Sequence, residues 1–210
     1  MTTQLFQTLF IFLGLAITLL LSAVWKAKAE CTCRVKVPMT FVALVTSIVI
    51  GSMIGFTDLN YIISGFLFLL LVGSILYPRV EYAGPALYLV GFIGIFAGFQ
   101  VAGIHDVFNI GLENISIFGA LIAIIIMFLK KQDNVTTIYI VGMSLFFITA
   151  STTIMLPLII ASVLITLSEV MLIYFKEEEE TASDEKALDV GYFSAGLYSF
   201  GVCLIPLVLL

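Results

Sequence analysis

Glu169 is the acidic residue placed deepest among apolar side chains, within the stretch Leu164–Tyr174. A carboxyl group in such surroundings is either neutral or ionised beside a donor, and in both states it can exchange a proton with a bound molecule. The sequence offers four potential donors: Tyr192, Tyr198, Ser74 and Arg79. The alternative is a structural role, in which Glu169 makes an interhelical hydrogen bond or extends toward a polar interface.

The composition places these residues in a membrane protein. Of the 210 residues, 61% are hydrophobic and 11% are charged, which is too few charged residues to cover the exterior of a soluble fold. The net charge of -5 and the scattered basic residues argue against a nucleic-acid partner. One His and three Cys argue against a zinc site and against a secreted disulfide scaffold, so we expect no metal and no cofactor.

Eight apolar segments have about the 20 residues that a helix needs to cross a hydrocarbon core of roughly 30 Å. They are Gln4–Trp25, Val37–Phe56, Leu59–Tyr77, Ala83–Gly103, Leu112–Leu129, Val135–Ala150, Thr152–Phe175 and Ala187–Leu207. The sixth and seventh are separated near Ala150, where Ser151–Thr153 is expected to cap the seventh and Pro157 lies in its first two turns. The sequence therefore predicts an all-α protein, with a single transmembrane domain of eight helices over residues 1–210.

The basic residues give this membrane bundle an orientation. All nine follow an odd-numbered segment: Lys26, Lys28, Arg34, Lys36, Arg79, Lys130, Lys131, Lys176 and Lys186. Because basic loops stay in the cytosol, that side is expected to be cytosolic and both termini non-cytosolic. The chain is thus predicted to be an integral, multi-pass membrane protein.

Other residues have simpler interpretations. His105 and Asp106 fall in a predicted lumenal loop, where they are either solvated or form an acid-base pair. Gly91, Gly94 and Gly98 place small residues along one side of the fourth segment, which is typical of a close helix-packing face.

Short motifs near the ends of the segments resemble a known family. Lys36-Val37-Pro38-Met39-Thr40 opens the second segment, Gly73-Ser74 lies near the end of the third, Ser168-Glu169 lies in the seventh, and Gly191-Tyr192-Phe193 opens the last. Together with the eight segments, these motifs resemble the YhhN-like lysoplasmalogenases, small eight-span membrane proteins of about this length. The likeness covers nearly the whole chain, and each motif is short.

The resemblance implies hydrolysis of the vinyl-ether bond of a lysoplasmalogen, which releases a fatty aldehyde and a glycerophospho-base. The family's proposed catalytic groups are membrane-embedded carboxylates, and vinyl-ether cleavage needs one acid and one base or charge stabiliser. Here Glu169 takes one of these places, whereas Ser74 stands where the family has an Asp and Ala97 and Gln100 lie where it tends to have a His. We expect Glu169 and Ser74 to be catalytic. The substrate-binding residues are expected to be Tyr192, Tyr198, Gln100 and Arg79.

Two other functions remain open at this point. The missing Asp favours a non-enzymatic protein of the same fold that binds lipid or acts as a scaffold. A small transporter would need several polar groups along one path, and only Glu169 is expected to lie deep. For the hydrolase and for the lipid-binding protein, the expected partner is a membrane lipid or a lysophospholipid. The sequence leaves the oligomeric state open.

Overall fold

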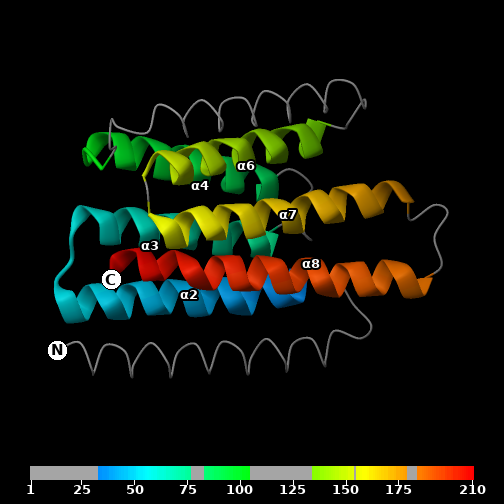
Figure 1. Ribbon diagram of the computed structural model, residues 1–210, viewed down its shortest axis with the longest axis horizontal. Coiled ribbons are helices and arrows are strands. Elements are labelled where there is room, and N and C mark those ends of the chain that lie inside the picture. The colour runs from blue at the N-terminus through cyan, green and yellow to red at the C-terminus, as the bar shows by residue number, and fades with distance from the viewer. Residues whose placement is uncertain (1–32, 77–82, 105–133, 154, 179–183) are drawn as a thin grey trace.

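The computed structural model describes residues 33–76, 83–104, 134–153, 155–178 and 184–210 (Figure 1). These residues form helices, and no strand occurs among them, so the prediction of an all-α chain is confirmed for this part of the protein. The elements are α2 (Cys33–Ile54), α3 (Asp58–Leu76), α4 (Ala83–Val101), α6 (Asn134–Thr152), α7 (Leu156–Glu178), α8 (Asp184–Leu204) and the 3-10 helix η1 (Ile205–Leu209).

The helices run side by side along the long axis of the molecule (Figure 1). Each of the six α-helices in the described ranges packs against two others, in the order α2, α3, α4, α6, α7, α8 and back to α2. The contacts therefore close into a ring. The helix η1 continues from α8 and contacts α2, α3 and α7, so the end of the chain packs inside one end of the ring.

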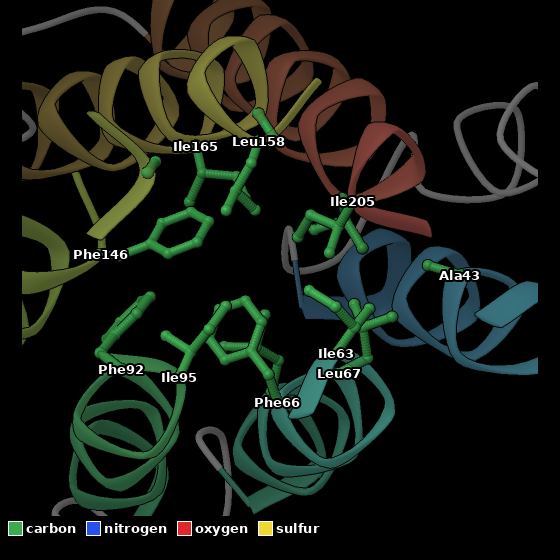
Figure 2. Packing of buried hydrophobic residues seen from close by; sticks show 14 of the residues in the cluster. Ala43, Ile63, Phe66, Leu67, Phe92, Ile95, Phe146, Leu158, Ile165 and Ile205 are labelled. Carbon is green, nitrogen blue, oxygen red and sulfur yellow. The ribbon is translucent and has the colours of Figure 1, made fainter. Parts of the chain in front are cut away.

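The centre of the ring is filled by apolar side chains from every helix (Figure 2). Phe66, Phe92 and Phe146 form an aromatic cluster between α3, α4 and α6, with ring centroids 5.1 to 5.6 Å apart. These are distances at which tilted aromatic rings attract one another beyond the burial of their area. Leu158 from α7 and Ile205 from η1 point toward the same space.

Three helices in the described ranges are long and apolar enough to cross a membrane: Lys36–Ile54, Asp58–Leu76 and Gly84–Val101. Shorter apolar stretches lie in α6, α7 and α8. Many large apolar side chains on the outside of the ring are exposed, among them Phe41, Phe68 and Val90. Exposed apolar side chains on long apolar helices are what a hydrocarbon environment requires.

The predicted segments correspond to these helices with shifted ends. The segment predicted over Val37–Phe56 begins four residues earlier, at Cys33. The segments Leu59–Tyr77 and Ala83–Gly103 match α3 and α4 to within two residues. The helix α8 begins three residues before the last predicted segment, Ala187–Leu207, and that segment ends within η1. The segments Gln4–Trp25 and Leu112–Leu129, together with His105 and Asp106, lie outside the described residues.

The predicted break between the sixth and seventh segments is present, but its capping differs. Thr153 donates its hydroxyl proton to the carbonyl oxygen of Ala150 at 2.9 Å, so it closes α6 rather than opening α7. At the start of α7, the backbone N–H groups of Leu158 and Ile159 donate to the carbonyl oxygen of Met155, the residue before the helix. Pro157 is the second residue of α7, where a missing N–H costs no intrahelical hydrogen bond.

The predicted small-residue face of α4 is present in part. A Cβ atom added at Gly98 would lie 2.9 Å from Ile62 Cγ1, and one added at Gly91 would lie 3.4 Å from Leu69 Cβ. Both glycines therefore allow α3 to approach closely. A Cβ added at Gly94 would meet nothing within 4 Å, so this glycine does not belong to that face.

Candidate functional site

A buried ion pair joins α2 to α7. The ammonium group of Lys36 donates a hydrogen bond to Oε1 of Glu169. Lys36 is 8% exposed and Glu169 is 4% exposed, so solvent reaches neither group to any great extent. A charge removed from water is tolerated when a close partner of opposite charge and further hydrogen bonds replace the lost hydration. The pair is therefore the main electrostatic feature of the described part of the chain.

Two residues hold Lys36 in place. The ring of Tyr198 on α8 lies 4.7 Å from Lys36 Nζ, measured to the ring centroid, which is within the range of a cation-π interaction. The Tyr198 hydroxyl and Thr40 Oγ1 are hydrogen-bonded at 3.4 Å. Thr40 in turn donates its proton to the carbonyl oxygen of Lys36 at 2.7 Å, so Tyr198 is the donor to Thr40. The lysine is thus restrained through its ammonium and through its backbone.

A second hydroxyl pair lies beside the ion pair. The Tyr88 hydroxyl on α4 and Ser74 Oγ on α3 are 2.5 Å apart, and both residues are buried. Ser74 donates its own proton to the carbonyl oxygen of Leu70 at 2.8 Å, so Tyr88 donates to Ser74. Tyr88 lies within electrostatic range of Tyr198 and Glu169. Polar groups from five helices therefore meet at one end of the ring.

The start of α2 places Lys36 beside Thr40. Lys36 lies in the first turn of α2, and Thr40 lies one turn further on the same face. Pro38 lies between them and cannot donate a backbone hydrogen bond within the helix. The ammonium group lies at the positive end of the helix dipole, which disfavours it, and the Glu169 carboxylate offsets this cost.

Glu169 is positioned by a contact between α7 and α8. Ser168 donates to the carbonyl oxygen of Ser194 at 2.8 Å, and Ser194 donates to the carbonyl oxygen of Ser168 at 3.0 Å. Both serines are buried. Reciprocal hydrogen bonds of this kind fix the register of two helices, so the residue that follows Ser168 is directed toward α2.

The structure brings some of the predicted site residues together. Glu169 and Tyr198 belong to one cluster with Lys36, and Ser74 joins it through Tyr88. The side chains of Tyr192 and Arg79 lie outside the described residues.

The structure does not bring Gln100 to this cluster. Gln100 is exposed, next to the last residue of α4. It is twelve residues from Tyr88, about 18 Å along the helix. The predicted orientation already places Gln100 near the non-cytosolic end of the fourth segment, whereas Arg79 precedes its cytosolic end, so the resemblance grouped residues from opposite ends of one helix.

Lys36 is the residue that sequence reasoning missed. The sequence predicts it just before the second segment, which begins at Val37, and the structure corrects this because Lys36 lies inside α2 and is buried. The assignment failed because hydropathy marks a helix by its apolar residues and places a charged first turn outside it. One signal was available, since Lys36 opens the motif Lys36-Val37-Pro38-Met39-Thr40.

Comparison of the chain with models of protein families, with curated proteins and with solved structures finds no match. The resemblance to YhhN-like proteins therefore remains a prediction from short motifs.

The chemistry available at the cluster is proton transfer. An ammonium group and a carboxylate in hydrogen-bond contact share one exchangeable proton, and each is the natural acceptor or donor of the other. The surrounding hydroxyl groups extend this network away from the pair. A molecule that bound between Lys36 and Glu169 would contact the ammonium group, an acid, and the carboxylate, a base.

Proposed function

We propose that the chain is a multi-pass membrane protein of eight spans, with both termini on the non-cytosolic side, that hydrolyses the vinyl-ether bond of a lysoplasmalogen. The observation that carries this proposal is the contact between Lys36 and Glu169. The sequence offered one carboxyl group without an evident partner, and the ion pair supplies the second group that the reaction needs.

The proposed reaction follows from the two groups. Vinyl-ether cleavage begins with delivery of a proton to the alkene carbon that is not bonded to the ether oxygen, which leaves an oxocarbenium-like carbon beside that oxygen. The Lys36 ammonium supplies this proton and becomes a neutral amine, and the Glu169 carboxylate stabilises the cation. Water then attacks the cationic carbon and returns one proton to the pair. The resulting hemiacetal breaks into a fatty aldehyde and the alcohol of the glycerophospho-base.

The location of two motifs supports the proposal. Lys36 comes from the motif that opens the second predicted span, and Glu169 comes from the Ser-Glu motif of the seventh. Each resembles the YhhN-like pattern separately, and 133 residues separate them along the chain. Their side chains are nevertheless in contact. Two motifs that meet in space are better explained by one shared site than by two unrelated likenesses.

A non-enzymatic lipid-binding protein is the second candidate. It is favoured by the third span, where Ser74 stands in place of the carboxylate expected from the family resemblance and is hydrogen-bonded to Tyr88. In this case Lys36 and Glu169 join α2 to α7, and the bundle holds a lysolipid without cleaving it.

The test is release of fatty aldehyde from a lysoplasmalogen by the purified protein in lipid nanodiscs. We expect Glu169→Gln to lower turnover by about 10²- to 10⁴-fold, the usual contribution of one acid-base group. Asp58→Asn is the matched control, because Asp58 is an exposed carboxylate at the start of α3. Equal turnover by the wild type and Glu169→Gln would remove Glu169 from the mechanism. Saturable lysolipid binding without aldehyde would favour the second candidate.

A further inference from the structure

We infer that α7 and α8 move as one unit that is hinged at η1, and that a lysolipid reaches the Lys36–Glu169 pair through the opening that this motion makes between α2 and α8. The inference deepens the proposed function and rests on it for the choice of a lysolipid as the ligand. It answers a requirement of the proposed reaction, because Lys36 is 8% exposed and Glu169 is 4% exposed. A substrate contacts both groups only when the helices around them separate.

The helices α2, α3, α4 and α6 form the first of two tightly packed groups. Ser47 on α2 and Ser64 on α3 are hydrogen-bonded through their hydroxyl groups at 2.9 Å. Gly98 allows α3 to approach α4 closely. A Cβ atom added at Gly142 on α6 would lie 3.5 Å from Leu89 Cα on α4, so these two helices also meet at their backbones. Close backbone contacts and interhelical hydrogen bonds of this kind resist separation of neighbouring helices.

The helices α7 and α8 form the second group. Ser168 and Ser194 donate to each other's carbonyl oxygens at 2.8 and 3.0 Å. A Cβ atom added at Gly201 on α8 would lie 3.0 Å from the carbonyl oxygen of Ala161, so α8 lies directly against the backbone of α7. Because these contacts fasten α7 to α8, the two helices are expected to move together.

The polar contacts described between the two groups gather in the first two turns of α2. The Lys36 ammonium donates to Glu169 on α7 and lies over the Tyr198 ring on α8. The hydroxyl groups of Thr40 and Tyr198 are hydrogen-bonded at 3.4 Å. We call these three contacts the latch. They depend on side chains that can change rotamer, so they can break without any change in the backbone of either group.

The hinge lies at the opposite end of α2 from the latch (Figure 1). There η1 follows α8 and contacts α2 and α3, and Ile205 of η1 points toward Ile63 and Leu67 of α3 (Figure 2). Pro206 lacks the N–H that would donate to the carbonyl oxygen of Val202, so the α-helical hydrogen bonds are interrupted where α8 meets η1. The break between α6 and α7 lies at the same end of the molecule (Figure 1). Both attachments of the α7–α8 unit are therefore at the hinge end.

The opening has to admit one hydrocarbon chain. The axes of packed helices lie about 8 to 10 Å apart. A chain inserted between two helices adds one layer of carbon atoms, which is about 4 Å. Rotation of the α7–α8 unit about η1 separates α8 from α2 more at the latch than at the hinge. The opening is therefore widest beside Lys36 and Glu169, where the substrate is needed.

The experiment measures distances between pairs of spin labels by pulsed electron paramagnetic resonance, using full-length protein in lipid nanodiscs with the three native cysteines replaced by Ala. One pair connects the two groups, with labels at Phe41 on α2 and Leu167 on α7, which are 55% and 48% exposed. The control pair lies within the first group, with labels at Phe41 and at the exposed Val90 on α4. Each pair is separated by one helix of the ring, α8 or α3.

We expect Glu169→Gln to raise the ratio of open to closed molecules by at least about tenfold without added lysolipid, because it weakens a hydrogen bond between charged groups. In open molecules the distance between the labels at Phe41 and Leu167 is about 4 Å longer, while the distance to Val90 stays the same. An alkyl-ether lysophosphatidylcholine, which has no vinyl-ether bond to cleave, is expected to lengthen the first distance equally in the wild type. Thr40→Val removes only the hydroxyl contact with Tyr198, so it keeps the test valid if Glu169→Gln does not fold.

An unchanged distance between Phe41 and Leu167 in folded Glu169→Gln and Thr40→Val would overturn the hinged unit. Equal lengthening of both label pairs would also overturn it, since the whole bundle would then have loosened. Lengthening in the variants but not with the lysophosphatidylcholine would overturn lipid entry between α2 and α8. Failure of the proposed function is separate. A wild type that opens with the lysolipid but releases no aldehyde from a lysoplasmalogen keeps the inference and loses the hydrolase.

Discussion

Replacing Lys36 by Met tests how much the ion pair between α2 and α7 stabilises the bundle. Methionine keeps most of the apolar stem of the lysine and removes the ammonium, so the main loss is electrostatic. Glu169 is 4% exposed and would then lose its counter-ion inside the bundle. Breaking a buried pair by removing one partner costs about 3 to 5 kcal/mol. The lost contact with the Tyr198 ring adds about 0.5 to 2 kcal/mol, while protonation of the carboxyl group limits the total.

The free energy of unfolding is measured by titrating the protein in mixed micelles with a denaturing detergent. We expect Lys36→Met to lower it by about 3 to 5 kcal/mol. The control is the double variant Lys36→Met with Glu169→Met, which removes both charges and keeps similar volume. Because burying two charges is itself costly, the double variant is expected to lie within about 1 kcal/mol of the wild type or above it. A Lys36→Met variant as stable as the wild type would refute the buried pair.

Two further predictions concern the contact between α7 and α8. A Cβ atom at Gly201 would lie 2.9 Å from Ile165 Cγ1 and 3.0 Å from the Ala161 carbonyl oxygen, so Gly201→Ala should destabilise the bundle by about 1 to 3 kcal/mol. Gly196→Ala meets nothing within 4 Å and is expected to be neutral or slightly stabilising, which a thermal melt of both variants will show. Ser168→Ala removes one of two reciprocal hydrogen bonds and should cost about 0.6 to 1.7 kcal/mol in the detergent titration, whereas a cost near zero would show that these bonds do not stabilise the contact.

Hydropathy was enough to predict the helices but not their ends. A run of apolar residues in a chain with 11% charged residues has no other stable form in a hydrocarbon layer, so α3 and α4 were placed to within two residues. The ends depend on single polar residues whose partners lie elsewhere in the chain. Thr153 was expected to cap α7 and instead closes α6, because a hydroxyl group near a helix end can bond in either direction.

Of the two charged residues in the candidate site, the sequence predicted Glu169 but not Lys36. Glu169 was found because a carboxyl group among apolar residues is rare and must face an interior partner. That partner could not be found from local sequence, since Lys36 lies 133 residues away and looks like a loop residue in a basic segment. In the ring, α8 packs against both α2 and α7, so Lys36 and Glu169 meet across it, and this arrangement depends on tertiary contacts that no single segment encodes.

Lys36 and Glu169 are 133 positions apart in the chain, and this separation determines when the ion pair can form during synthesis of the proposed membrane bundle. A ribosome adds about 5 to 20 residues per second, so about 7 to 27 s pass between synthesis of the lysine and synthesis of its carboxylate. During that interval the ammonium group remains in the water or head-group layer, because a lone charge is costly in hydrocarbon. In the proposed membrane bundle, α2 therefore reaches its final depth only when α7 supplies the carboxylate, and a chain terminated before α7 leaves Lys36 without Glu169.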